Sequence, residues 1–136
     1  MSRGERDQEN SPDRDYSFGY KEGVLDYMNY RALKSFEFVL PYLQPGMDVL
    51  ECGSGPGVVT LEIAKKVNRG SVIGIDINED LIDSNNKKAR DSNVINLKFE
   101  VASILELPYP NDSFDIVYMQ ALIVHMKDPN KAMKEV

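Results

Sequence analysis

Short apolar runs along this chain alternate with stretches in which apolar residues recur at helical spacing. The runs 48–51 and 71–75 are typical of strands buried in a parallel sheet, and the second ends on Asp76. Residues 96–101 alternate between apolar and polar side chains, which predicts a third strand. The apolar run 114–119 predicts a fourth.

The stretches between these runs favour helices. We expect one or two helices over about 24–40, where Pro41 follows, and another over about 58–67. Asn78 is placed to cap a helix over about 79–91, and Asp128-Pro129 begins a last helix. Strands that alternate with helices predict a parallel sheet with right-handed crossovers.

A glycine-rich turn follows the first strand, with the sequence Glu51-Cys52-Gly53-Ser54-Gly55-Pro56-Gly57. Glycine adopts positive φ and lets a ligand approach the backbone. The carboxyl end of a strand is also where open α/β sheets bind ligands. A dinucleotide fingerprint requires G-x-G-x-x-G/A, but its third position here is Val58, which disfavours a nicotinamide-dependent oxidoreductase.

The pattern E-x-G-x-G-x-G resembles the first motif of the class I, Rossmann-like S-adenosylmethionine-dependent methyltransferases, with a lean towards the branch that methylates small molecules such as quinones and sterols. The resemblance implies an α/β fold, with a Rossmann-like parallel sheet and helices on both faces, and S-adenosylmethionine as the cofactor. It covers the incomplete domain 16–136, and residues 1–15 are expected to be a flexible polar arm.

Asp76 is the second anchor of the predicted site. A carboxylate at the end of the second strand can accept hydrogen bonds from both ribose hydroxyls, although Asp76 can alternatively cap the next helix.

In the family, an aspartate after the third strand holds the adenine amino group, and Ser103 takes its position in this chain. A hydroxyl accepts a hydrogen bond without the strength that charge adds, which predicts weaker affinity for the cofactor.

The remaining site residues follow from the same resemblance. Gln120 is expected near the sulfonium, and Ile104 lies either against adenine or in the core. Tyr16 or Tyr20 either covers the sheet edge or closes over the cofactor. The predicted cofactor-binding residues are Tyr20, Glu51, Cys52, Gly53, Ser54, Gly55, Gly57, Asp76, Ile77, Ser103, Ile104 and Gln120.

From the sequence we assign no catalytic residue and no metal ligand. His125 is the sole histidine, so it cannot form a metal site or a triad by itself, and we expect it to pack in a helix rather than act in the site. Cys52 is expected to pack rather than act as a nucleophile.

Composition limits which kinds of partner and which cellular location we expect. The 136 residues suit one domain, and the net charge of −6 opposes a large nucleic-acid interface. The single cysteine forms no internal disulfide, so we expect the cytoplasm. No apolar run approaches the ~20 residues of a membrane span.

Methyltransferases of this kind normally add three more strands, whose region helps to form the acceptor pocket. The family's strand order predicts 3-2-1-4 here, with the apolar fourth strand at an edge. We therefore expect either a truncated form, or a second copy of the chain or another partner that covers this edge. The functions left open are methyl transfer to a small-molecule acceptor and a non-catalytic module that binds the cofactor or a partner; methyl transfer to any acceptor would exclude the module.

Overall fold

The computed structural model describes residues 22–120 and 127–136. Along the chain the elements are α1 (Glu22–Phe36), a 3₁₀ helix (Leu40–Tyr42), β1 (Asp48–Cys52), α2 (Val58–Lys66), β2 (Ser71–Asp76), α3 (Glu79–Asp91), β3 (Leu97–Val101), β4 (Ile116–Met119) and α4 (Pro129–Glu135). The expectations for the arm 1–15, Tyr16, Tyr20 and His125 lie outside the described residues.

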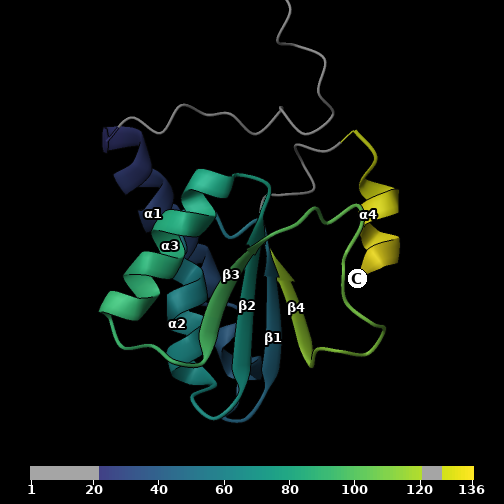
Figure 1. Cartoon of the computed structure of the whole chain (residues 1–136), viewed down its shortest axis with the longest axis horizontal. Coiled ribbons are helices and arrows are strands. Elements are labelled where there is room, and N and C mark those ends of the chain that lie inside the picture. The colour runs from purple at the N-terminus through teal and green to yellow at the C-terminus, as the bar shows by residue number, and fades with distance from the viewer. Residues whose placement is uncertain (1–21, 121–126) are drawn as a thin grey trace, which may run out of the picture.

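The four strands form a parallel sheet in the order β3-β2-β1-β4, which confirms the predicted order (Figure 1). In its register, Glu51 lies between Gly74 on β2 and Tyr118 on β4, and Gly74 pairs with Phe99 on β3. Residues paired across parallel strands point to the same face. Tyr118, Glu51, Gly74 and Phe99 therefore form one row across the sheet.

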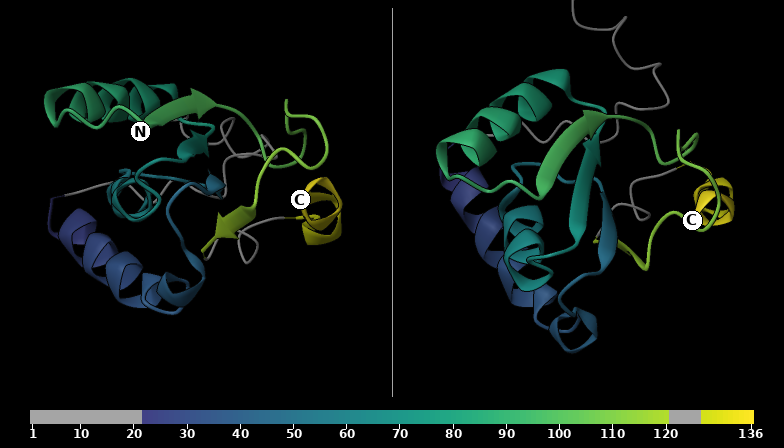
Figure 2. Two further views of the ribbon diagram at one scale, coloured as in Figure 1. Left: turned by 90° about the horizontal axis from the view of Figure 1, so that it is seen from below. Right: turned by 60° about the horizontal axis from the view of Figure 1, so that its bottom comes forward.

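Helices cover both faces of the sheet, as Figures 1 and 2 show. Helices α1, α2 and α3 cover one face, and α4 and the loop after β3 lie against the other. Because strand side chains alternate, Val49 packs in the core under α1 and α2, while Leu50 packs against Ala132 of α4 in the opposite core. The predicted α/β architecture is confirmed.

The differences from the predicted elements lie at their ends. The stretch expected to be helical over 24–40 divides into α1, which ends at Phe36, and the short 3₁₀ helix. Asn78 caps α3 as predicted, since its side chain accepts the N–H of Leu81 at 3.1 Å. None of the helices in the described part of the chain is long and apolar enough to cross a membrane.

Candidate functional site

The turn between β1 and α2 requires a left-handed backbone at three positions. The φ angles are +73° at Gly53, +51° at Gly55 and +80° at Gly57. A side chain at Gly57 would place its Cβ 2.8 Å from the Phe99 ring, whereas nothing lies within 4 Å of a Cβ at Gly55. Glycine is thus needed for conformation at all three positions and for close packing at Gly57.

The backbone N–H groups of this turn are used inside the protein. Those of Gly53 and Ser54 both donate to the carbonyl of Ile75 at 2.9 Å. The N–H of Gly55 donates to Asp76, and that of Gly57 donates to the carbonyl of Ser54 at 3.0 Å. A phosphate-binding loop would instead aim such groups at its ligand. These four N–H groups are therefore not directed at a phosphate.

Asp76 connects the turn to the start of α3. The side chain is 5% exposed, and its Oδ2 accepts the N–H of Gly55 at 3.0 Å. Its Oδ1 accepts the N–H of Asn78, also at 3.0 Å, while Asn78 itself caps the helix. Since each carboxylate oxygen can accept more than one hydrogen bond, both retain capacity for a ligand's hydroxyl groups.

Glu51 is a second buried carboxyl group at the same end of the sheet. It is 5% exposed, and its Oε2 accepts the hydroxyl of Thr60 from α2 at 2.5 Å. Burial raises the pKa of Glu51 to about 8; the hydrogen bond from Thr60 opposes this shift, and the charge of Asp76 adds to it. Thr60 can approach the sheet here because Gly74 has no side chain: a Cβ would lie 2.9 Å from the Thr60 methyl group.

Two buried residues that the sequence analysis did not single out support the turn. Thr60 holds Glu51, and Asn85 of α3 donates through Nδ2 to the carbonyl of Gly55 at 2.7 Å. Asn85 occupies a polar position among the buried residues Ile82 and Ala89 of α3, which is the sequence signal that would have found it. The Oδ1 of Asn85 and the Oγ of Ser54 are buried without a partner among the described residues.

The segments after β3 and β4 reach the same end of the sheet, because the carboxyl ends of parallel strands lie together. After β3, the hydroxyl of Ser103 accepts the N–H of Leu105 at 3.1 Å. Ile104 is 5% exposed and packs in the core beneath α4, which favours its packing role. After β4, the amide oxygen of Gln120 accepts the hydroxyl of Tyr118 at 2.8 Å.

Cys52 and Ile77 differ in what they can present to a ligand. The side chain of Cys52 is fully buried in the core on the face opposite Glu51. Burial, followed by the charge of Glu51, raises the pKa of Cys52 to about 12, so the thiol stays protonated and inert at neutral pH. A ligand can therefore reach only the backbone of Cys52. Ile77, at 41% exposed, offers its side chain.

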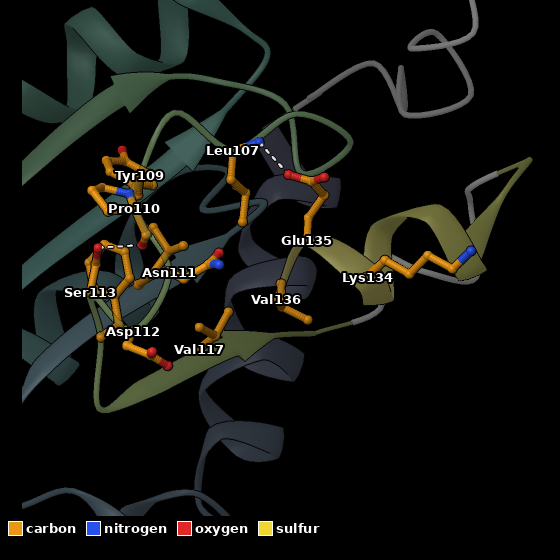
Figure 3. A pocket seen from close by; sticks show the side chains of 12 residues that line it. Leu107, Tyr109, Pro110, Asn111, Asp112, Ser113, Val117, Lys134, Glu135 and Val136 are labelled. Carbon is orange, nitrogen blue, oxygen red and sulfur yellow. Dashed lines mark hydrogen bonds between the residues drawn. The ribbon is translucent and has the colours of Figure 1, made fainter.

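A separate pocket of about 380 Å³ lies on the α4 face of the sheet (Figure 3). Its wall joins the loop before β4 to α4, and the Leu107 N–H donates to Glu135 across it at 3.1 Å. The loop leads into the amino end of β4, whereas the glycine turn follows the carboxyl end of β1. None of the predicted cofactor-binding residues that the structure describes lines this pocket, so it is distinct from the described part of the site at the turn.

A model of a family described as a methyltransferase domain matches residues 43–136. This chain belongs to the class I S-adenosylmethionine-dependent methyltransferases. The family expected from the glycine motif is thereby confirmed.

In the part of the chain that the structure describes, no three His, Cys, Asp or Glu side chains are grouped to hold a metal ion.

Three similar proteins illustrate the relationship. The chain is 41% identical over 117 residues to the ubiquinone/menaquinone biosynthesis C-methyltransferase UbiE of Rickettsia bellii, covering 82% of this chain and 47% of that protein. An uncharacterized methyltransferase of Schizosaccharomyces pombe is 33% identical, with 72% of this chain and 37% of that protein covered. A SAM-dependent methyltransferase structure from Aquifex aeolicus is 25% identical, with a TM-score of 0.65 over 79% of this chain and 55% of that one.

These matches also define how much of a family member is present. The chain spans less than half the length of the two curated relatives. The matched region nevertheless contains the glycine turn, Asp76 and the start of the helix after each of the first two strands.

Proposed function

We propose that this methyltransferase-family chain binds S-adenosylmethionine at the turn between β1 and α2, and that it is the cofactor-binding part of an enzyme that methylates a small molecule. The observation that carries the proposal is the buried Asp76, which is fixed by Gly55 and Asn78 beside a turn whose N–H groups are already used. S-adenosylmethionine brings a ribose and a positive charge but no phosphate, and these properties match the site.

The residues fit distinct parts of the cofactor. Asp76 would accept the ribose hydroxyls, and Ile77 and Ser103 would border the adenine. Glu51 and the turn would face the methionine part of the cofactor, which carries the sulfonium, and Gln120 would also lie near the sulfonium. The full proposed set remains Tyr20, Glu51, Cys52, Gly53, Ser54, Gly55, Gly57, Asp76, Ile77, Ser103, Ile104 and Gln120, within a domain at 16–136.

The chain's part in the reaction would be to bind and orient. The cofactor supplies a methyl group on a positively charged sulfur, so the leaving group is already activated. Holding two reactants in line can contribute up to about 7–11 kcal/mol to the lowering of a barrier. The rigid hydrogen-bonded turn and the Tyr118–Gln120 pair are suited to that task. No residue is assigned as a general base.

The acceptor and the partners are further parts of the proposal. The name of the Rickettsia bellii relative supports a quinone-type acceptor methylated on carbon. Strand β4 pairs with β1 alone among the described strands, so a second copy or another partner would cover its other edge. The single, buried cysteine is compatible with a cytoplasmic location.

A second candidate is a non-catalytic module that binds the cofactor or a partner. Methyl transfer from labelled S-adenosylmethionine to a quinone-type acceptor by the purified chain would exclude this candidate.

Isothermal titration calorimetry with S-adenosylmethionine tests the binding proposal. We expect a micromolar dissociation constant for the unchanged chain and at least about tenfold weaker binding for Asp76→Ala, because hydrogen bonds to a charged group are lost. The matched control is Asp83→Ala, which removes an exposed carboxylate of α3 and should leave the affinity unchanged. Absence of binding by the folded, unchanged chain would contradict the proposal.

A further inference from the structure

Glu51 is a buried acid, and no cation is among the described groups that shift its pKa. It lies in the row across the sheet, with Tyr118 beside it on β4 and the side-chain-free Gly74 beside it on β2. Thr60 reaches it from α2 as a neutral donor. Asp76 acts on it from the end of β2 as a like charge, and Cys52 is its titratable neighbour on β1.

This environment disfavours an ionised carboxylate in the free protein. Burial removes the water that would stabilise the charge, and Asp76 repels it. One hydrogen bond from a neutral hydroxyl offsets only part of this loss. The pKa of Glu51, raised to about 8 by this burial, agrees with the geometry.

A cationic ligand at the turn would reverse that balance. An opposite charge nearby favours the ionised form of an acid. S-adenosylmethionine has a net charge of +1 from its sulfonium, ammonium and carboxylate groups. S-adenosylhomocysteine, the product that remains after methyl transfer, has lost the sulfonium charge and is neutral overall.

We propose that Glu51 holds a proton in the free chain and releases it to solvent when S-adenosylmethionine binds, so that the site distinguishes the charged cofactor from its neutral product. The inference rests on the proposed cofactor. Only a proton moves: the O–H bond of the Glu51 carboxyl group breaks, its electron pair stays on oxygen, and the buffer takes the proton. The carboxylate then balances the charge of the bound cofactor.

Because proton release accompanies the binding of S-adenosylmethionine, the binding affinities of the two ligands should depend differently on pH. Release of one proton strengthens S-adenosylmethionine binding up to tenfold for each pH unit below the pKa of the free group, and the gain ends above it. S-adenosylhomocysteine leaves the proton in place, so its affinity changes less. The ratio of the two affinities should therefore rise from pH 6 to pH 8.

Calorimetry at pH 7 in buffers of different ionisation enthalpy measures the protons released. We expect nearly one proton for each S-adenosylmethionine bound and nearly none for S-adenosylhomocysteine. Glu51→Gln should release nearly none with either ligand. The matched control Glu79→Gln changes an exposed carboxyl group of α3 and should retain the release.

The outcomes separate this inference from the proposed function. Binding of S-adenosylmethionine without proton release would overturn the role of Glu51 and leave the cofactor assignment standing. Proton release that persists in Glu51→Gln would also overturn it. Absence of S-adenosylmethionine binding would instead overturn the proposed function.

A measurement on the free chain needs no ligand. Infrared difference spectra between pH 6 and pH 10 should show a buried carboxyl C=O band that disappears with a midpoint near pH 8 and is missing in Glu51→Gln. A spectrum in which the unchanged chain lacks this band at pH 6 would overturn the inference independently of any cofactor.

Discussion

In the proposed site Asp76 has two tasks, because the oxygen atoms that would bind a ribose also hold the turn in place. Its Oδ2 fixes Gly55 and its Oδ1 fixes Asn78. A change at Asp76 therefore alters both the ligand contacts and the shape of the turn. Ser103 is proposed to contact the ligand and makes no hydrogen bond to the turn among those described, so it gives a cleaner test at this scale.

Ser103→Asp should strengthen the binding of S-adenosylmethionine about fivefold. A carboxylate would accept the adenine amino group through a charge-assisted hydrogen bond, which is about 1 kcal/mol stronger than a neutral one. The serine oxygen that now accepts the N–H of Leu105 can be replaced in that bond by a carboxylate oxygen.

The control for this change is Ser103→Asn, which has the same shape as aspartate without its charge. Dissociation constants of the three chains are compared by calorimetry at one pH. Equal affinities for Ser103→Asp and the unchanged chain would place the adenine elsewhere.

At the scale of elements, the glycine turn connects β1 to α2 and contacts α3 and β3. Gly55 is held by Asp76 and Asn85, while Gly57 packs directly on Phe99. The two glycines share a left-handed backbone but differ in the space around them. They therefore separate the effect of conformation from the effect of packing.

Gly57→Ala should lower the free energy of unfolding more than Gly55→Ala. Alanine at Gly55 costs about 1 kcal/mol for its left-handed backbone. At Gly57 the new methyl group also meets the Phe99 ring, which adds about 1–3 kcal/mol of overpacking. Urea unfolding of the two variants measures the difference, and equal losses would show that Phe99 does not constrain the turn.

The elements were largely predictable because each carries its own local signal. The strand preceding the turn, the Asn78 cap and the strand order followed from apolar runs, capping chemistry and the family motif. The supports of the turn were not found in this way. The apolar spacing around Asn85 indicates that it is buried, but Thr60 and Asn85 meet Glu51 and Gly55 only after α2 and α3 pack on the sheet. No local pattern identifies those partners.

On the scale of the whole molecule, the buried Glu51 makes the free energy of unfolding depend on pH. The pKa of Glu51 is about 8 in the folded chain and 4.5 in its ordinary state. The folded chain therefore holds this proton more firmly than the unfolded chain. The stability that this provides is fully present below about pH 4.5 and is lost as the pH rises through 8.

Glu51→Gln should remove this dependence on pH. Between pH 5 and pH 8, Glu51 lowers the free energy of unfolding by up to about 1.4 kcal/mol for each pH unit. Relative to the unchanged chain, the variant should thus gain stability steadily over that range. Urea unfolding at pH 5, 6, 7 and 8 provides the comparison, in which other titrating groups contribute equally to both proteins. Parallel curves would mean that Glu51 ionises normally in the folded chain.

The location of the cofactor is the central claim, and an NMR titration of the ¹⁵N-labelled chain with S-adenosylmethionine tests it most directly. We predict that the largest amide shifts occur at residues 53–55 and 57, at 76–78 and at 103–104. Shifts confined to the separate pocket around Leu107, Phe114 and Lys134, or no shifts in a folded chain, would contradict the assignment of the site to the glycine turn.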